Sequence, residues 1–133
     1  MELGEYSSEY LYSSESYRIV GVCMEVHRRL GCGFLEAVYK DAIEFEMTAR
    51  MIPFERERFY EVWYKGRKLT HGYCADFVVG DKIILEVKAL SAGMDNFHIA
   101  QTINYLKISG CEVGLLINFG KDKLETRRLI LTK

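Results

Sequence analysis

Charged side chains interrupt two strongly apolar stretches near the middle of the chain. Asp76 lies within CADFVV, and Glu86 and Lys88 lie within IILEVKAL. Successive side chains of a strand point to opposite faces, so Glu86 and Lys88, two residues apart, share a face. An isolated charge in apolar surroundings is strongly unfavourable unless it is paired or bound to a metal ion. Two acids and a lysine on adjacent strands match a site for a hard divalent cation, which prefers oxygen ligands.

The turn between the two stretches decides whether the two acids meet. A two-residue loop at Gly80-Asp81 places Asp76 and Glu86 on opposite faces of the hairpin. A three-residue loop, with Val79 facing Ile83, places the two acids directly opposite each other. We predict the three-residue loop, or a bulge of equivalent effect. Opposed carboxylates weaken a sheet, so their presence favours a role in binding a ligand.

An alternative is an exposed hairpin on which Asp76, Glu86 and Lys88 form a solvated network of ions. The E-x-K tripeptide is by itself a weak signal. The flanking residues of IILEVKAL and CADFVV favour the buried site, because they are too apolar for an exposed face.

Other residues could also contribute to chemistry. Glu36 lies in the first turns of a predicted helix, where a negative charge is favourable in any case. His98, Gln101 and Tyr105 follow one another at i, i+3 and i+7 and form a stripe on another predicted helix. Tyr105 fits a core position equally well, whereas packing explains Gln101 less easily.

Cys23 and His27 stand four residues apart on a predicted helix and could supply two zinc ligands. A tetrahedral zinc site needs two further ligands, and the sequence offers no second pair. Buried free thiols are the alternative that we favour. The four cysteines form no C-x-x-C pair, and the N-terminus lacks the apolar core of a secretory signal, so we expect a cytoplasmic protein.

Composition limits the remaining possibilities. The 133 residues are 49% hydrophobic and 28% charged, which is typical of one soluble globular domain. Eighteen basic and nineteen acidic residues give a net charge of -1, which argues against binding to nucleic acid through bulk positive charge. A local basic face remains compatible with this balance. No apolar stretch is long enough to span a membrane.

The elements that would position these residues follow from hydrophobic periodicity. We expect an α/β fold with a mixed sheet, in which the strands at 83–89 and 113–119 are parallel because a helix connects them. In the second helix we expect Leu35, Val38, Ala42, Phe45 and Ala49 to face inward. The predicted helices are 16–30, 34–51 and 96–109, and the other predicted strands are 59–64, 69–79 and 124–131.

A set of motifs in a fixed order resembles a known family. Gly33 to Tyr39 fits the pattern G-x-x-E-x-x-Y, and Asp76, the tripeptide Glu86-Val87-Lys88, and Gln101 with Tyr105 follow it in order. From about residue 19 to 119 the chain resembles the GxxExxY family of the PD-(D/E)XK nuclease superfamily; EVHRRLG and GLLINFG are similar to that family too. One departure is an alanine, at position 75, where such families often have proline before the acid.

The resemblance implies a restriction-endonuclease-like core, a central mixed β-sheet flanked by α-helices. It implies a single nuclease-like domain over residues 15–133. The preceding residues 1–14 are rich in Ser, Tyr and Glu without a sustained period, so we expect a mobile leader or a segment that docks through Tyr10, Leu11 and Tyr12. Asp76 and Glu86, with the Val87 carbonyl, would hold Mg²⁺, for which Mn²⁺ could substitute, and Glu36 would complete the metal shell directly or through water. Lys88 would position the attacking water during phosphodiester hydrolysis. Gln101 and Tyr105 would support the site or touch the substrate backbone.

The resemblance also implies a nucleic-acid partner, and we favour DNA recognised through its backbone. Basic residues that could meet phosphates cluster in two segments: Lys65, Arg67 and Lys68, and Lys121, Lys123, Arg127 and Arg128. Solvated surface is the alternative for both clusters. A nuclease fold that serves only in binding or assembly is the alternative function. The sequence leaves open whether the protein forms a homo-oligomer.

Overall fold

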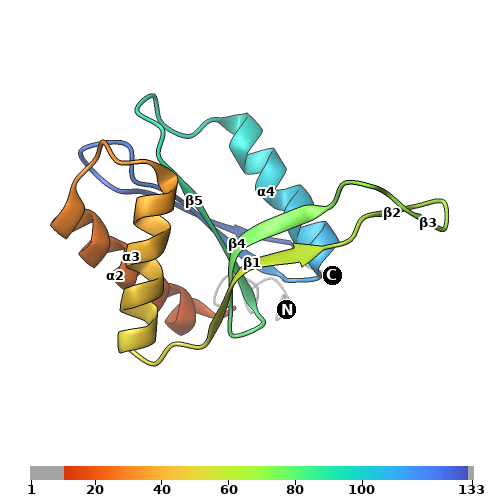
Figure 1. Cartoon of the computed structure of the whole chain (residues 1–133), viewed down its shortest axis with the longest axis horizontal. Coiled ribbons are helices and arrows are strands. Elements are labelled where there is room, and N and C mark those ends of the chain that lie inside the picture. Colours follow the sequence, from red (N-terminus) through yellow and green to blue (C-terminus); the bar gives the residue numbers. More distant parts are fainter. Residues whose placement is uncertain (1–10, 132–133) are drawn as a thin grey trace, which may run out of the picture.

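A computed structural model describes residues 11–131, which form one mixed sheet with helices on both faces (Figure 1). The helices are α2 (Ser13–Leu30), α3 (Glu36–Ala49) and α4 (Asn96–Ser109). The strands are β1 (Phe54–Tyr60), β2 (Trp63–Tyr64), β3 (Arg67–Lys68), β4 (Tyr73–Val79), β5 (Ile83–Lys88), β6 (Val113–Asn118) and β7 (Glu125–Ile130). These elements confirm the predicted restriction-endonuclease-like α/β class, a central mixed β-sheet flanked by α-helices.

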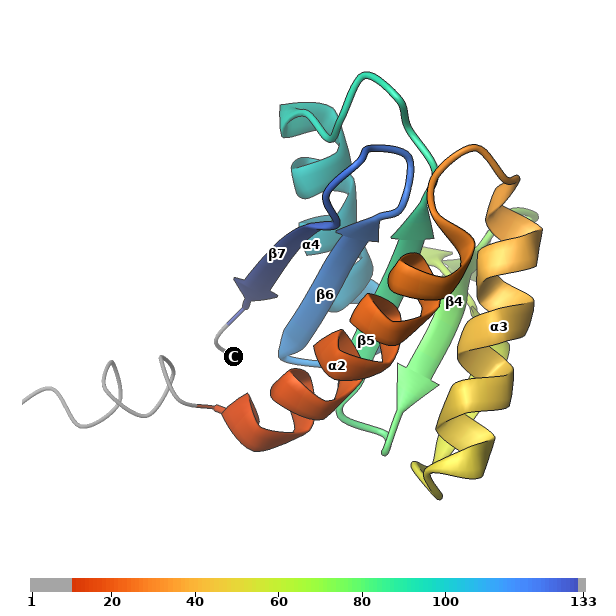
Figure 2. The same ribbon diagram turned by 90° about the vertical axis from the view of Figure 1, so that its left-hand side faces the viewer.

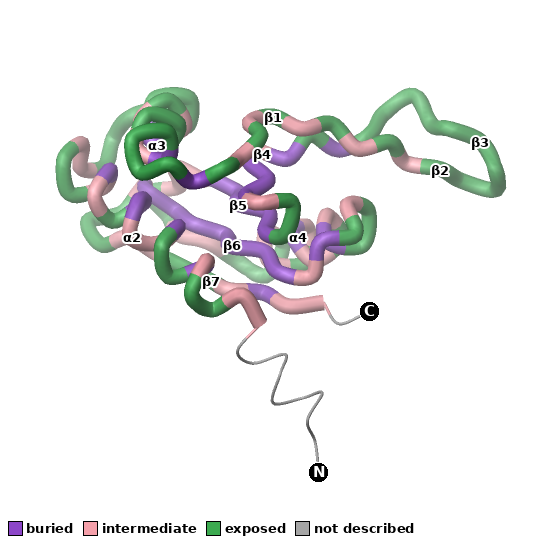
Figure 3. Tube along the Cα trace, turned by 90° about the horizontal axis from the view of Figure 1, so that it is seen from below, coloured by how far each residue is buried: buried purple, intermediate pink, exposed green. Residues whose placement is uncertain are grey.

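The sheet has the strand order β1-β4-β5-β6-β7. Strands β5 and β6 are parallel, as predicted from the helix that connects them, and every other neighbouring pair is antiparallel. Strands β2 and β3 form a separate two-stranded ribbon. The central strands are buried on both faces, which explains why the sequences of β5 and β6 are almost continuously apolar (Figure 3).

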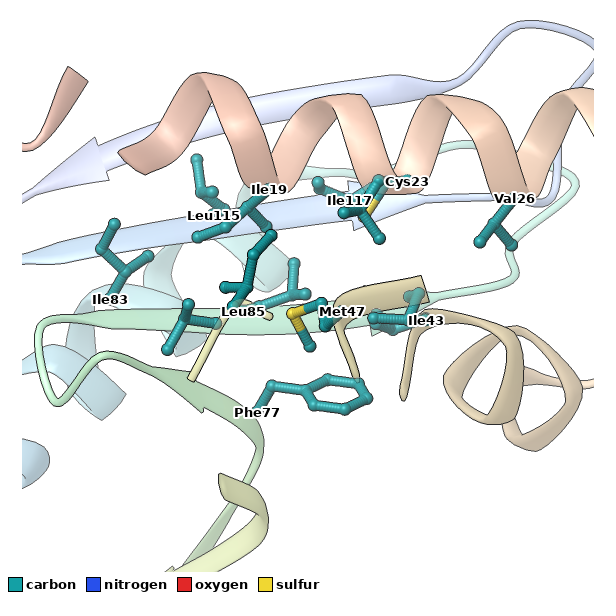
Figure 4. Packing of buried hydrophobic residues seen from close by; sticks show 14 of the residues in the cluster. Ile19, Cys23, Val26, Ile43, Met47, Phe77, Ile83, Leu85, Leu115 and Ile117 are labelled. Atoms are coloured by element: carbon teal, nitrogen blue, oxygen red, sulfur yellow. The ribbon is translucent and has the colours of Figure 1, made fainter. Parts of the chain in front are cut away.

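Helices α2 and α3 cover one face of the sheet, and α4 covers the other (Figure 2). The larger core lies under α2 and α3, where Ile19 and Cys23 pack towards β5 and β6, and Met47 packs near Phe77 (Figure 4). The second core lies under α4 and includes Leu106 together with residues of β4, β5 and β7. Helix α4 approaches β6 closely, because a Cβ at Gly114 would lie 3.3 Å from Leu106.

Several predicted boundaries and faces differ from the structure. In α3 the buried residues are Tyr39, Ile43 and Met47, so most of the predicted inward stripe is wrong. Leu35 is 79% exposed and Phe45 is 73% exposed, Val38 and Ala49 are exposed too, and only Ala42 of the predicted set packs against the core. The helix carries apolar residues on two sides, and the sheet covers the side that also bears Tyr39. Strand β1 begins at Phe54, before the predicted 59–64 segment; the hydrophobic pattern did not predict its first residues because the sequence FERERFY is highly charged. Its side chains alternate between half-buried and exposed, as expected at a sheet edge.

The start of the described chain is anchored to the sheet. Helix α2 begins at Ser13, two residues before the predicted domain start, and Leu11 and Tyr12 pack against the larger core. The Arg128 guanidinium donates a hydrogen bond to the Leu11 carbonyl. Most of the predicted leader, residues 1–10, lies outside the described residues. No helix within residues 11–131 combines the length and apolarity needed to cross a bilayer.

Candidate active site

The β4–β5 hairpin has the predicted three-residue loop. Val79 pairs with Ile83 and Phe77 pairs with Leu85, so the loop consists of residues 80–82. Gly80 and Asp81 both have positive φ angles, 59° and 58°, which bring the chain around. This register directs the next residues, Asp76 and Glu86, towards each other.

Carboxylate groups replace the backbone ladder where β4 and β5 pass the site. The Asp76 amide donates a hydrogen bond of 3.0 Å to Oε2 of Glu86, and the Val87 amide donates one of 2.8 Å to Oδ2 of Asp76. Each acid therefore satisfies an amide of the opposite strand. Both carboxylates are held between the strands by backbone groups, which fixes them more firmly than side-chain contacts alone would.

Strand β4 changes the face that its side chains present at Asp76. Ala75 packs in the core under α4, whereas Phe77 packs in the core under α2 and α3, although an uninterrupted strand would place both on one face. In the neighbouring edge strand, Glu57 has a left-handed φ of 58° and lies in the gap between the pairs Arg56–Phe77 and Arg58–Ala75. Asp76 and Glu57 thus mark a local distortion shared by the two strands, a feature that often accompanies a functional site.

Glu86 is the more buried of the two acids, with 5% of its surface exposed. Burial is the largest cause that raises the pKa of Glu86, and the neighbouring charge of Asp76 adds to it, so that the pKa rises to about 7. The Tyr73 hydroxyl donates a 2.7 Å hydrogen bond to Oε2. Oε1 has no hydrogen bond within residues 11–131 and is not sealed from solvent. One oxygen of Glu86 therefore remains open for a ligand.

Lys40, on α3, is a site residue that the sequence interpretation missed. Its ammonium lies 3.0 Å from Oδ1 of Asp76 and 3.7 Å from Glu57, and its side chain is only 14% exposed. Burial lowers the pKa of Lys40, but the hydrogen bond and charge of Asp76 outweigh it, so the net shift is upward. Lys40 lies four residues after Glu36, on the same face of the helix, and this spacing was the available signal.

Glu36 and Lys88 both lie at the end of the fold where α3 begins and β5 ends. Glu36 is the exposed first residue of α3, and Lys88 is the half-buried last residue of β5; these two element ends are both at the upper edge in Figure 2. Lys88 has no hydrogen bond or ion pair within residues 11–131. No group of three or more His, Cys, Asp and Glu residues in that range is arranged to hold a metal ion. The structure thus brings Asp76 and Glu86 together but does not bring Glu36 into the same group.

Helix α4 reaches the carboxylates through stacked tyrosines. Tyr105 stacks on Tyr73 with ring centres 3.6 Å apart, and the Tyr73 hydroxyl bonds to Glu86. Burial, and then the negative charges of Glu86 and Asp76, raise the pKa of Tyr105. Gln101 lies one turn earlier, is half-buried and has no hydrogen bond within residues 11–131. His98 serves the helix itself, since it forms a capping box with Asp95.

Comparison with known proteins identifies the superfamily of the chain and a solved structure of similar fold. A family profile described as the PD-(D/E)XK nuclease superfamily matches residues 13–129. The chain belongs to the PD-(D/E)XK nuclease superfamily. A crystal structure of a protein designated SSO0001 is similar in fold, with a TM-score of 0.57 and 18% sequence identity over 92% of this chain. The match covers 61% of the length of that protein. No curated protein sequence matches the chain.

Cys23 and His27, which were considered as zinc ligands and disfavoured, have other roles. Cys23 is fully buried in the core under α2, where desolvation raises the pKa of its thiol well above the usual range. Nε2 of His27 lies 2.8 Å from the carbonyl of Lys121 and forms a hydrogen bond with it. All four cysteines are free thiols. The helix spacing of Cys23 and His27 therefore reflects packing and a loop contact.

The charges of Asp76 and Glu86 in this PD-(D/E)XK protein are suited to binding a divalent cation. Glu86 and Asp76 repel each other, and Oε1 of Glu86 lacks a partner within the described residues, so a cation beside both acids would relieve the repulsion. In the structure the Lys40 ammonium supplies part of this compensation at Asp76. The donor set of hard oxygen atoms fits Mg²⁺ or Mn²⁺ rather than a thiophilic metal.

Proposed function

We propose that the chain is a metal-dependent nuclease that hydrolyses phosphodiester bonds of DNA, and that it belongs to the GxxExxY branch of its superfamily. The observation that supports this most directly is the pair of Asp76, which is half-buried, and Glu86, which is buried: each carboxylate accepts a hydrogen bond from a backbone amide of the opposite strand. A carboxylate pair of this kind destabilises the fold, because burial and the charge of Asp76 hold the pKa of Glu86 above its ordinary value. Groups that a protein keeps at such a cost often belong to a functional site. The free cysteines are in keeping with a cytoplasmic, reducing environment.

Asp76 and Glu86 would hold Mg²⁺, with Mn²⁺ as a possible substitute, and Glu36 and the Val87 carbonyl would add ligands. When bound, the cation would supply Lewis-acid assistance to hydrolysis of the phosphodiester. The backbone amides of Asp76 and Val87 keep the two carboxylates oriented before the cation arrives. Preorganisation of this kind reduces the cost of assembling the site during the reaction.

Lys88 would orient the attacking water and offset negative charge that builds up on the phosphate. Its ammonium forms no hydrogen bond or ion pair within residues 11–131, and its positive charge favours the ionised form of Glu86. Lys40 has a different role in the proposal, because it neutralises Asp76 and Glu57 at the back of the site. The Tyr73 hydroxyl donates a hydrogen bond to Glu86, and the ring of Tyr105 stacks on that of Tyr73. Gln101 would contact the substrate backbone beside these two residues.

The test is a cleavage assay on single- and double-stranded DNA and RNA with Mg²⁺, Mn²⁺ or EDTA. Asp76→Asn and Lys88→Ala are expected to abolish metal-dependent cleavage while thermal unfolding remains cooperative. Lys107→Ala, an exposed lysine near the end of α4, is the matched control and should retain activity. Cleavage by the purified Lys88→Ala variant at the wild-type rate would refute the assignment.

A nuclease fold that only binds or assembles is the second candidate. The observation in its favour is that Glu36 does not join Asp76 and Glu86 in a group of metal ligands within the described residues, while Lys40 contacts Asp76. Calorimetry with Mn²⁺ separates the two candidates. Metal binding that disappears in Glu86→Gln supports the nuclease, whereas DNA binding without any metal binding supports the binding module.

A further inference from the structure

A two-stranded arm projects from the body of the protein beside the candidate active site. The arm, residues 61–72, contains β2, β3 and their turn, and it extends well beyond the sheet at the right of Figure 1. Trp63 and Tyr64 are each 61% exposed on it. Large aromatic side chains are rarely exposed together on a short ribbon unless they contact a partner. The packing of the domain does not explain these two residues.

Basic side chains accompany the aromatic ones on the arm. Lys65, Arg67 and Lys68 are exposed, and Glu61 is the only acidic residue of the segment. The arm is therefore positively charged although the whole chain has a net charge of -1. Lys68 forms a 3.6 Å ion pair with Glu61, and the Lys65 ammonium lies 5.5 Å from the centre of the Tyr64 ring. A partner that suits this surface combines negative charge with flat apolar groups.

The register of the ribbon places one aromatic ring and one cation on each of its faces. Trp63 pairs with Lys68, and Tyr64 pairs with Arg67. Directly paired residues share a face, and neighbouring residues of a strand point to opposite faces. Each face thus offers a ring on which a base can stack and a cation for the adjacent phosphate. Single-stranded nucleic acid binds proteins through this combination.

The base of the arm is joined to the carboxylate site. Tyr60 and Tyr73, which flank the arm in the sequence, pair with each other and stack with ring centres 5.9 Å apart. Tyr73 then contacts both Tyr105 and Glu86. The two segments that lead into and out of the arm lie close together at Gly72, where a Cβ would lie only 2.4 Å from the Tyr60 carbonyl oxygen, so this position requires glycine. Trp63 follows Tyr60 by three residues, which corresponds to about 10 Å of extended chain.

We propose that this arm binds unpaired nucleotides of a nucleic-acid strand, with bases stacked on Trp63 and Tyr64 and phosphates on Lys65, Arg67 and Lys68. A strand held there leads past the stacked tyrosines to Asp76 and Glu86. The inference deepens the proposed nuclease function, because it assigns the substrate a single-stranded segment and a place of entry. A duplex fits less well, since its base faces are covered by stacking.

Tryptophan fluorescence tests the proposal directly, because Trp63 is the only tryptophan in the chain. The full-length protein is titrated in EDTA, where metal-dependent hydrolysis cannot occur, with oligo(dT), oligo(U), a DNA duplex and an abasic strand of equal length. We expect saturable quenching by oligo(dT) or oligo(U), and weaker binding of the duplex and the abasic strand. The logarithm of the affinity should fall with the logarithm of salt concentration with a slope of about −2, from three phosphate contacts.

Variants separate stacking from charge, with binding followed by the anisotropy of a labelled strand. Trp63→Ala is expected to weaken binding about fivefold or more with little change in salt dependence, and the double variant Lys65→Ala/Arg67→Ala should reduce the salt slope. Tyr17→Ala, which removes an 82% exposed aromatic ring on α2, is the matched control and should bind normally. Equal binding of the normal and abasic strands, unchanged Trp63 emission, or contact of the arm with a second protein chain instead of nucleic acid overturns the proposal.

Cleavage assays keep this inference distinct from the proposed function. Quenching of Trp63 by single strands without cleavage under any metal condition refutes the hydrolysis and supports the arm as a binding element. Metal-dependent cleavage that persists unchanged in Trp63→Ala and in the double lysine–arginine variant, with no quenching in the wild type, supports the nuclease and overturns the role of the arm.

Discussion

Replacing Glu86 with glutamine is expected to stabilise the metal-free protein while removing its metal site. Glutamine keeps an oxygen that can accept hydrogen bonds from Tyr73 and from the Asp76 amide, as Oε2 of Glu86 does. It removes the negative charge that burial and Asp76 disfavour. If the carboxylate served only in packing, the metal-free protein should lose stability when Glu86 is replaced. If it serves to bind a cation, the metal-free protein should gain stability.

The magnitude follows from the pKa of Glu86. Burial raises this pKa from 4.5 to about 7, and each unit corresponds to about 1.4 kcal/mol, so ionisation in the folded state costs about 3 kcal/mol. Below pH 4.5 Glu86 is protonated in both the folded and the unfolded state, so the wild-type protein does not bear this cost. The free energy of unfolding then falls by about 3 kcal/mol as the pH rises from 4.5 through 7. The advantage of Glu86→Gln should therefore be about 3 kcal/mol at pH 8 and should vanish near pH 4.5.

Urea unfolding at 25 °C from pH 4.5 to pH 8, in EDTA, measures this difference. Glu61→Gln is the control, because it removes an exposed glutamate whose ion pair with Lys68 contributes little to stability. Adding Mn²⁺ at pH 8 should stabilise the wild type and leave Glu86→Gln unchanged. A Glu86→Gln variant that is less stable than the wild type at pH 8, or a difference that does not depend on pH, would refute the reasoning.

Three further predictions concern Lys40, the protonation of Glu86, and Asn118 at the end of β6. Lys40→Met should destabilise the metal-free protein by about 1–3 kcal/mol in urea, because it leaves Asp76 without its cation, and a gain of stability would contradict the role of Lys40. Calorimetry with Mn²⁺ should show affinity falling about fivefold from pH 7 to pH 6, since Glu86 must lose its proton to bind; constant affinity would contradict this. Asn118→Ala should destabilise the fold by about 3 kcal/mol in the same urea assay, because the fully buried side-chain amide of Asn118 forms hydrogen bonds with both the N–H and the carbonyl of Leu90. An effect below about 1 kcal/mol would contradict this and show that water replaces these hydrogen bonds.

Local patterns in the sequence were sufficient to predict the hairpin that carries the acids. The loop length of three residues followed from requiring Asp76 and Glu86 to meet, and the observed pairing of Val79 with Ile83 confirms it. The parallel pairing of β5 with β6 followed from the helix between them. These features depend on short-range spacing, which a single sequence records directly.

Features that depend on contacts between distant segments were not predictable in this way. Lys40 lies 36 residues before its partner Asp76, and only the packing of α3 on the sheet reveals their contact. The buried side of α3 was mistaken because apolar residues such as Phe45 occupy its exposed side too. The change of face at Asp76 occurs opposite Glu57, whose backbone is left-handed, and this conformation is uncommon for a glutamate and is not predictable from the sequence.

The central claim is that Asp76 and Glu86 together bind one divalent cation. Calorimetric titration of the full-length protein with Mn²⁺ at pH 8 tests it most directly, beside the variants Asp76→Asn and Glu86→Gln. We predict one binding site in the wild type and no measurable binding in either variant, although both remain folded. Unchanged binding in either variant would place the cation elsewhere and contradict the claim.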